Sequence, residues 1–383
     1  MSKDDNSLPL DQIAEIVTGK SNVVDATLDG LYPLFDRSQQ VKKSKRYLYD
    51  TEAVIVPGEG KEFIPRYYKG KFDLHQRAYA LIPNEKVDGR FLYYSVMHNR
   101  DHFSRVAVGS TVKSLRLDSF KSLSIHLPPL EKQKSIANVL TTFDDKIELN
   151  RQTNATLEAI AQAIFKEWFV YFNYPGATGE LVESELGFIP KGWRVEKIGK
   201  ILKTKLGGTP STKKKEYWEN GIIPWINSGK VNEFRIIEPS TYITKEAVRK
   251  SNTKLLPKRT VVIAITGATL GQVSLLEIDS CANQSVIGIL ENESIPSEYI
   301  YLWVVSNIQS IISNQSGGAQ QHINTNDVNN SLIVVPDYQV LTNFHQLISP
   351  VFDRESLLCF ESASLAKIRD LLLPRLMNGE IEV

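Results

Sequence analysis

The chain has 383 residues and a formal net charge of +1. This length exceeds what one ordinary core uses, so we expect two or more domains. The two cysteines, Cys281 and Cys359, argue against a disulfide-built secreted fold. The first residues lack the charged and then apolar pattern of a signal, and no run approaches the roughly 18 apolar residues of a membrane span. We therefore expect a soluble, cytoplasmic protein without a membrane partner.

Residues 1–128 predict a first globular part of mixed α/β structure. Runs of β-branched residues that end at glycine or proline, such as EAVIVPGEG and RAYALIP, predict short strands. The stretch GRFLYYSVMHN predicts a short helix. Residues 37–71 hold 9 basic and 4 acidic side chains, a local charge of +5. Such a block is typical of a surface that binds a phosphate backbone, and equally of a solvated lysine-rich surface.

Residues 129–172 predict one long central helix. Pro128 and Pro129 mark its start, where proline is tolerated. A strict 4-3-4-3 spacing continues for 33 residues, which is roughly 50 Å of helix and typical of a coiled coil. The predicted seam consists of Ile136, Leu140, Phe143, Ile147, Asn150, Asn154, Leu157, Ala161, Ile164 and Trp168.

Residues 173–336 predict a linker and a second globular part. The runs TVVIAITGATLG and SVIGIL predict strands, and PSEYIYLWVVSNIQSII predicts a helix. Residues 197–258 hold 14 basic and 5 acidic side chains, a local charge of +9. The basic charge of the chain therefore lies in two separate blocks, one in each globular part.

Residues 337–383 predict a second long helix. Its seam consists of Phe344, Ile348, Val351, Glu355, Leu358, Ser362, Leu365, Arg369, Leu372 and Leu376. The two seams contain the polar residues Asn150, Asn154, Glu355, Ser362 and Arg369. If these side chains are buried, they fix the register of the helix pair at a cost in stability. Alternatively, the helices splay apart there and the side chains face solvent. Pro350 predicts a break, with Ser349 as N-cap and Pro350 at the first position of the main helix. The sequence MNGE predicts a stop at Asn378 and Gly379.

The second half of the chain repeats the first at an offset of 208 residues. Nine of the 57 positions from Leu74 to Leu130 are identical, among them Gln76 with Gln284. Near the start of each copy an offset of 191 fits better, so the second copy contains an insertion of roughly 17 residues. We predict a mixed α+β fold with two globular α/β parts, separated by two long helices that form an antiparallel coiled coil with pseudo-two-fold symmetry.

Several stretches resemble the specificity (S) subunits of type I restriction–modification enzymes. In the helices and linker these are LPPLEKQKSIANVL, GELVESELGFIPKGWRV and IRDLLLPRLMNGEI. In the second globular part they are GGTPST, IPWINSGKV, ITGATLGQVSLL, NQSVIGIL and GGAQQHIN, and in the first GLYPLFDRSQ, AVIVPGEG and KFDLHQRAYALIP. The resemblance covers nearly the whole chain, and the order of the parts agrees.

The resemblance implies that each globular part is a target-recognition domain that reads one half of a split DNA sequence. The two long helices would be the family's conserved regions, which set the spacer and dock methyltransferase (M) subunits, here two. A restriction (R) subunit would join through them. The resemblance also implies that this chain carries no catalytic activity and no cofactor. S-adenosylmethionine for DNA methylation would lie on the M subunits, and ATP and Mg on the R subunit.

The sequence lacks the signatures of catalytic sites. It has no G-x-x-x-x-G-K-[ST] phosphate loop and no Asn-Pro-Pro-aromatic motif of amino-methyltransferases. Its six histidines and two cysteines show no metal-ligand spacing. We therefore predict no catalytic residue and no metal site.

Candidate DNA contacts divide into phosphate and base contacts. The phosphate candidates are Lys42, Lys43, Lys45, Arg46, Ser211, Lys213, Lys214 and Lys215. The base candidates are His75, Gln76, Arg77, Asn227, Lys230, Asn283, Gln284, Gln320, Gln321 and His322. Because Gln76 and Gln284 match across parts that would read different bases, a scaffold or phosphate role is expected for them. Gln320, Gln321 and His322 differ from their counterparts and are the better candidates for specificity, against a structural turn.

A second interpretation of the same pattern is a bivalent scaffold whose two globular parts bind protein or RNA, with the coiled coil as a spacer. Strongly salt-dependent affinity for duplex DNA would favour the first interpretation. Salt-insensitive binding to a protein would favour the second.

Overall fold

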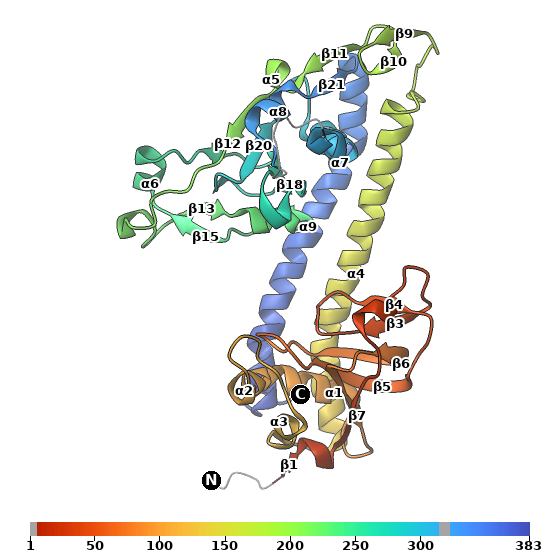
Figure 1. Ribbon diagram of the computed structural model, residues 1–383, viewed down its shortest axis with the longest axis vertical. Coiled ribbons are helices and arrows are strands. Elements are labelled where there is room, and N and C mark those ends of the chain that lie inside the picture. Colours follow the sequence, from red (N-terminus) through yellow and green to blue (C-terminus); the bar gives the residue numbers. More distant parts are fainter. Residues whose placement is uncertain (1–5, 314–321) are drawn as a thin grey trace. The chain divides into compact units, whose positions relative to one another are not determined.

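The computed structural model describes residues 6–313 and 322–383 (Figure 1). By compactness the chain divides into two units, one of residues 1–148 with 364–383 and one of residues 149–363. Helices α4 (Leu130–Phe169) and α9 (Tyr338–Met377) belong in part to each unit. The four expected segments, 1–128, 129–172, 173–336 and 337–383, stay a prediction, because compactness cuts through both long helices instead. No helix in the described ranges is long and apolar enough to cross a membrane.

Head 1, the globular part of the first unit, extends from β1 to β8. One six-stranded sheet has the order β2-β7-β5-β6-β3-β4, and β1 pairs with β8. Alternate residues of β5 face opposite sides, so that Val54 and Val56 pack with the helices while Ala53 and Ile55 fill a second core. The elements are β1 (Ser7–Pro9), η1 (Leu10–Gln12), β2 (Ala14–Thr18), η2 (Val23–Asp25), β3 (Tyr32–Phe35), β4 (Lys42–Ser44), β5 (Tyr49–Pro57), β6 (Arg66–Leu74), β7 (Ala78–Pro83), α1 (Gly89–His98), α2 (Arg100–Val106), α3 (Leu117–Lys121) and β8 (Ser124–His126).

Head 2, the globular part of the second unit, extends from β11 to β21 and follows the hairpin of β9 (Leu181–Ser184) and β10 (Gly187–Pro190). Its two main sheets have the orders β12-β20-β17-β18-β14 and β15-β13-β19-β16. The elements are β11 (Arg194–Lys197), α5 (Ile198–Ile201), β12 (Lys203–Leu206), η3 (Lys215–Tyr217), β13 (Ile223–Ile226), η4 (Ser228–Asn232), β14 (Arg235–Ile236), β15 (Thr241–Ile243), α6 (Lys245–Lys250), β16 (Leu255–Leu256), β17 (Val261–Ala264), η5 (Gly267–Thr269), β18 (Val273–Leu276), β19 (Ser280–Ala282), β20 (Val286–Leu290), α7 (Ser297–Ser313), α8 (Thr325–Asn330) and β21 (Leu332–Val335).

The internal repeat is visible in the strand pairing. Strand β2 pairs antiparallel with β7, and β12 pairs in the same way with β20. Strand β3 pairs parallel with the end of β6, and β13 pairs parallel with β19. The long strand β6 corresponds to both β18 and β19, because the chain leaves the sheet between Leu276 and Ser280. One sheet in head 1 therefore becomes two sheets in head 2.

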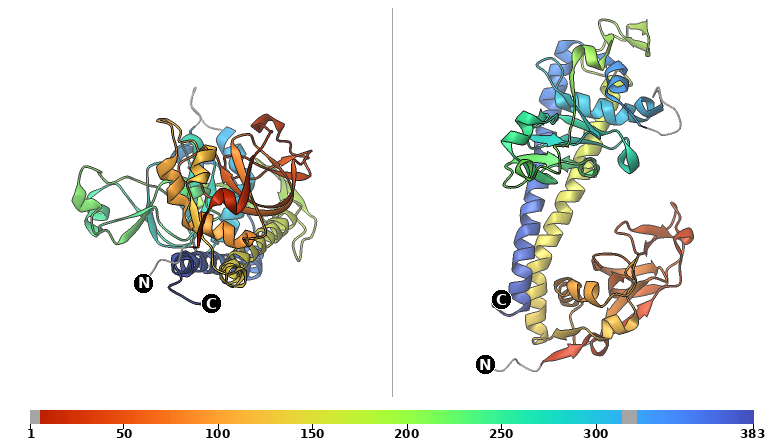
Figure 2. Two further views of the ribbon diagram at one scale, coloured as in Figure 1. Left: turned by 90° about the horizontal axis from the view of Figure 1, so that it is seen from below. Right: turned by 60° about the vertical axis from the view of Figure 1, so that its left-hand side comes forward.

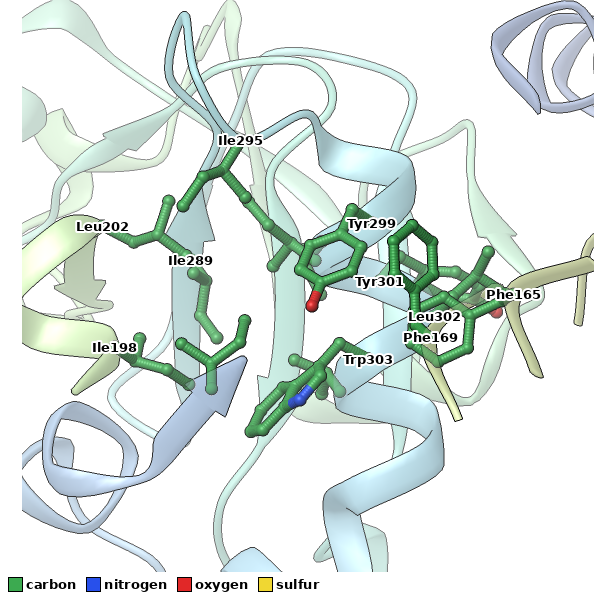
Figure 3. Packing of buried hydrophobic residues seen from close by; sticks show 14 of the residues in the cluster. Phe165, Phe169, Ile198, Leu202, Ile289, Ile295, Tyr299, Tyr301, Leu302 and Trp303 are labelled. Atoms are coloured by element: carbon green, nitrogen blue, oxygen red, sulfur yellow. The ribbon is translucent and has the colours of Figure 1, made fainter. Parts of the chain in front are cut away.

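The two long helices pair antiparallel within each unit (Figure 2). In the first unit the start of α4, with Ile136 and Leu140, shares a core with Leu373 and Leu376 near the end of α9. In the second unit the end of α4 packs on the start of α9, where the ring of Phe344 lies 4.8 Å from that of Phe169. This second core also takes in aromatic side chains of α7 (Figure 3). The antiparallel pairing predicted from the sequence is thus observed in both units.

Burial along the helices follows the two predicted seams. All twenty seam residues are buried or half-buried. The polar members Asn150, Asn154 and Glu355 have exposures of 1%, 7% and 0%, so they do not lie on a splayed, solvent-exposed section. Asn150 donates to the side chains of Glu361 and Ser362 across the helix pair.

The predicted break at Pro350 is wrong. Helix α9 is continuous from Tyr338 to Met377, and Pro350 lies inside it. The fully buried side chains of Phe344, Ile348 and Phe352 anchor the turns on both sides of the proline in one core. Pro350 and Gln346, the residue whose carbonyl lacks an amide partner, are both exposed, so water can satisfy that carbonyl. The stop at Asn378 and Gly379 is confirmed, and Gly379 has a φ of +70°.

Candidate nucleic-acid interface

Polar residues follow two parallel strands in head 2. Strands β13 and β19 run in the same direction, with Ile226 opposite Ala282, so their carboxyl ends lie at one edge. Asn227 and Asn283 come directly after these ends, and the Asn283 amide donates to the Ile226 carbonyl at 3.0 Å. The fold therefore brings two candidate base-reading segments together, although 56 residues separate them in the sequence.

Head 1 has the same arrangement at equivalent positions. Phe35 at the end of β3 lies opposite Leu74 at the end of β6. The amide of His75 donates to the Phe35 carbonyl at 2.9 Å, as that of Asn283 does in head 2. The candidate segment His75–Arg77 thus lies at the edge that corresponds to Asn283 and Gln284.

A third loop completes each cluster. In head 2 it follows β12, and the hydroxyl of Thr209 donates to Oε1 of Gln284 at 2.6 Å. In head 1 it follows β2, and Nε2 of Gln76 donates to Oδ1 of Asn22 at 2.5 Å. We call these sets the head 1 loop cluster (residues 19–22, 36–38 and 75–77) and the head 2 loop cluster (residues 207–209, 227 and 283–284).

Both clusters depend on glycine at the loop that follows the first strand. A Cβ atom on Gly19 would lie 1.8 Å from the carbonyl oxygen of Leu74. A Cβ atom on Gly207 would lie 2.1 Å from the carbonyl oxygen of Asn283. The backbones approach so closely that no larger residue fits, which keeps the third loop against the other two.

Three of the base candidates have structural partners. Oδ1 of Asn227 accepts from the Lys230 amide at 3.3 Å and caps η4, while the Lys230 ammonium lies 2.7 Å from Glu233. Oδ1 of Asn283 accepts from the Ser285 amide at 3.1 Å. These hydrogen bonds hold the head 2 loop cluster in shape, and Asn227 and Gln284 are its exposed amides.

In head 1, His75 is buried and Arg77 is exposed. Burial lowers the pKa of His75, so the imidazole is neutral near pH 7, and its Nδ1 accepts from the Arg77 amide at 3.0 Å. The Arg77 guanidinium lies 2.5 Å from Glu59, which also pairs with Arg37 at 2.6 Å. The His75 side chain is therefore packed inside head 1, and Arg77 is, like Arg37, an exposed cation at this edge.

Carboxylates accompany most basic candidates of head 1. Lys42 pairs with Asp36 at 2.6 Å, and Lys45 pairs with Asp29 at 2.8 Å. The guanidinium of Arg46 donates to Ser21 at 3.0 Å and lies within 4 Å of Asp25 and Asp73. The Lys45–Asp29 pair is exposed and contributes little energy, so Lys45 can exchange partners, whereas the carboxylates of Asp36 and Asp73 beside Lys42 and Arg46 are buried. Lys43 is exposed, and in the described part of the chain it belongs to no ion pair.

The basic stretch of head 2 begins two residues after Thr209. The indole of Trp218 donates to the Ser211 carbonyl at 3.2 Å and folds this stretch against the head. The Lys214 ammonium lies 3.3 Å from the Tyr217 hydroxyl, and Lys215 lies 3.9 Å from Glu219. Lys213 is exposed, without an ion pair in the ranges that the structure covers.

Gln320 and Gln321 lie outside the described residues. His322 is exposed and precedes Ile323, whose amide donates to the Ile265 carbonyl at 3.0 Å. Ile265 in turn donates from its amide to the Ser285 carbonyl at 3.0 Å. These two backbone hydrogen bonds place His322 close to the edge of head 2 that carries Gln284.

Two buried polar groupings were not found from the sequence. We call the first the Arg235 bridge. The side chain of Arg235 on β14 is fully buried and donates to Glu355 of α9 and, at 3.2 Å, to Glu158 of α4. Burial raises the pKa of Glu355 to about 7, and the neighbouring Glu158 carboxylate adds to this shift. The Arg235 guanidinium lowers the pKa but does not compensate for these two effects. The available signals were weak: a charged residue beside the apolar pair Ile236–Ile237, and Glu355 within the seam.

The second grouping, the Tyr94 bridge, lies in the first unit. The hydroxyl of Tyr94 on α1 donates to Asp144 of α4 at 2.6 Å, and Asp144 also accepts from Arg369 of α9. Burial and the Asp144 carboxylate raise the pKa of Tyr94, which keeps its proton available for donation. The sequence had marked Arg369 only as a polar seam residue.

Within the described residues, no group of three or more His, Cys, Asp and Glu side chains is placed to hold a metal ion. Exposed amide and hydroxyl groups lie at both loop clusters, and the head 1 loop cluster also has the exposed cations Arg37 and Arg77. These groups match base edges and phosphates in their hydrogen-bonding chemistry.

Comparison with known proteins points to one family. The family model described as "Type I restriction modification DNA specificity domain" matches residues 4–159 and 190–348. The chain is 29% identical to the type I restriction enzyme MjaIX specificity subunit of Methanocaldococcus jannaschii over 79% of this chain and 71% of that protein. It is 26% identical to the HindI specificity subunit of Haemophilus influenzae, over 85% of each chain.

A crystal structure of a type I restriction–modification S subunit from M. genitalium has the same fold. The structural match covers 98% of each chain, with a TM-score of 0.60 and 17% sequence identity. The two regions that the family model matches include both heads and most of α4, in the order expected from the sequence. The chain belongs to the family of type I restriction–modification specificity subunits.

Proposed function

We propose that this chain reads a bipartite, asymmetric DNA sequence, with each head on one half of the site. The observation that carries the proposal is the pair of loop clusters. Both lie at equivalent strand ends of a duplicated head, and both present an exposed glutamine beside exposed amide or hydroxyl groups, with the cations Arg37 and Arg77 added in head 1. The clusters differ in their remaining residues, as an asymmetric target requires. Asp36–Ser38 in head 1, for example, correspond to Asn227–Gly229 in head 2.

The long helices would set the spacer between the half-sites and dock M subunits. Four apolar residues on the outer surface of the helices support docking. Leu149 and Ile160 of α4 are 55% and 45% exposed, and their counterparts at an offset of 208, Leu357 and Ile368 of α9, are 60% and 45% exposed. Apolar positions that are exposed in both copies favour two equivalent partners, one for each helix.

In this proposal the chain itself catalyses no reaction. The M subunits supply S-adenosylmethionine for DNA methylation, and an R subunit that uses ATP and Mg²⁺ completes the complex in the cytoplasm. The contribution of this chain is recognition: amides and cations at the loop clusters pair with base edges and phosphates, while the helices carry the partners.

Binding of duplex DNA by the assembled complex tests the proposal against a protein-binding or RNA-binding scaffold. We expect affinity for duplex DNA to fall steeply between about 50 and 200 mM salt, as release of counterions requires. Binding that is insensitive to salt, or that prefers single-stranded RNA or a protein over duplex DNA, would contradict it.

A further inference from the structure

Each head is joined to both long helices by a polar bridge, which is buried in the second unit and half-buried in the first. In the second unit the three partners are Arg235 of head 2, Glu158 of α4 and Glu355 of α9. The Arg235 guanidinium also lies over three aromatic rings, those of Phe234 at 4.0 Å, Tyr301 at 4.6 Å and Phe352 at 4.8 Å. One side chain of the head is therefore fixed on several sides by groups of α7, α9 and α4.

In the first unit, different residues connect the head to the two long helices. Tyr94 of head 1, Asp144 of α4 and Arg369 of α9 form the bridge there. The arginine lies on α9 in this unit and on the head in the other. Tyr94 is 2% exposed, whereas the side chains of Asp144 and Arg369 are half-buried.

The two bridges are not copies made by the duplication. At the offset of 208, Asp144 corresponds to Phe352 and Glu355 corresponds to Ile147. Arg369 corresponds to Ala161. Two unrelated sets of residues thus link a head to both helices, and each unit contains one.

Buried polar contacts impose orientation in a way that apolar packing does not. Apolar side chains tolerate small slides and rotations, whereas a buried donor that loses its acceptor is left unsatisfied. The Arg235 bridge has little tolerance for such a change, because Nε of Arg235 and Oε1 of Glu355 already lack partners. Any rotation of head 2 on its helices would add further unsatisfied groups.

We infer that the Arg235 bridge and the Tyr94 bridge are positioning devices that hold each head at one angle to the helices and thereby limit the complex to one spacer length. The inference rests on the proposed function, because spacing has meaning only for a bipartite DNA site. None of the six bridge residues contacts DNA in this account. They act through the orientation of the loop clusters.

The test uses variants that remove a bridge and preserve volume. Arg235→Met with Glu355→Met replaces the buried ion pair by apolar side chains of similar size, a change that proteins often tolerate. Tyr94→Phe removes only a hydroxyl group, so it gives a readout even if the double variant fails to assemble. Each variant is co-expressed with the M subunits, and methylated sites are mapped across a genome.

Two matched controls remove polar contacts within a head. Lys250→Met with Glu246→Met deletes an exposed pair on α6 whose atoms lie 2.7 Å apart. Tyr49→Phe deletes a hydrogen bond of 2.9 Å to the Thr18 carbonyl within head 1. Both controls leave the helix contacts intact and should keep the wild-type spacer.

We expect the bridge variants to methylate the same two half-sites and to accept spacers one base pair longer or shorter. Such sites should gain about tenfold in methylation, which corresponds to roughly 1.4 kcal/mol of lost discrimination. The inference is overturned if Tyr94→Phe directs methylation only to sites with the wild-type spacer and if any double variant that assembles does the same. Failure of the wild-type protein itself to direct methylation to a split site contradicts the proposed function instead, so the two failures are distinguishable.

Discussion

Gln76 and Gln284 occupy equivalent positions in the two heads, and each bonds to the loop that follows the first strand of its sheet. The partners and the directions differ, since Gln76 donates to Asn22 in head 1 and Gln284 accepts from Thr209 in head 2. Each glutamine nevertheless links the same two loops of its own head. This relationship favours a scaffold role for both glutamines.

Gln284→Ala should therefore weaken binding without altering the sequence that is read. We expect affinity for duplexes that carry the site to fall about two- to tenfold, the effect of one lost hydrogen bond of roughly 0.5–1.5 kcal/mol. Gln339→Ala, on an exposed position of α9, serves as the control. A methylation motif that changes at one base pair of one half-site would show instead that Gln284 reads a base.

The lysines at Lys213–Lys215 should contribute to affinity and to its salt dependence. Replacing all three by alanine should lower the slope of log affinity against log salt by about 0.9 for each lysine that contacts a phosphate. The motif should stay unchanged, because phosphate contacts carry no sequence information. Lys191→Ala, at an exposed ion pair outside this basic block, is the control. An unchanged slope would place this segment away from DNA.

Stability of the second unit should depend on pH through Glu355. Its pKa is about 7 in the folded protein, above the ordinary value of 4.5, so folding binds a proton between these values. The stabilisation is complete below about pH 4.5 and is lost as the pH rises through 7.

Wild-type protein should therefore lose on the order of 1 kcal/mol of unfolding free energy between pH 6 and 8, relative to Glu355→Gln, which has no proton to lose. Denaturation at several pH values measures this difference. Glu246→Gln, at an exposed pair, should keep the wild-type profile. Parallel profiles for wild type and Glu355→Gln would mean that the Glu355 carboxylate stays ionised.

Pro350→Ala should stabilise the protein. Alanine restores the amide donor to the Gln346 carbonyl inside a helix that is already continuous, which removes part of a cost of about 3 kcal/mol. We expect the free energy of unfolding to rise by about 1–3 kcal/mol. Leu347→Ala, at a position that is 48% exposed on the same helix, should change it by less than about 0.5 kcal/mol. A loss of stability in Pro350→Ala would indicate that the proline begins a separate helix.

The sequence predicted the elements whose signal is local. The a/d spacing identified both long helices, and β-branched runs that end at glycine or proline, such as EAVIVPGEG, identified strands such as β5. The internal repeat, at offsets of 191 and 208, predicted two copies of one head, and the pairs β2–β7 and β12–β20 are equivalent. Each of these signals lies within one periodic stretch or one alignment of the chain with itself.

The features that sequence reasoning missed depend on distant residues. The break at Pro350 followed a local rule, which the packing of Phe344, Ile348 and Phe352 overrides. Arg235 and Glu355 are separated by 120 positions, and no periodic pattern connects them. In head 1 the count of basic residues did not reveal that Lys45 and Asp29 pair, because charge counts ignore neighbours in space.

The decisive experiment on how this chain reads DNA is to map methylated adenines after co-expression with the M subunits. We predict one split motif, with two specified halves separated by a fixed number of unspecified base pairs, and one methylated adenine in each half. An unsplit motif, or a pattern of methylation that does not depend on this chain, would contradict the account.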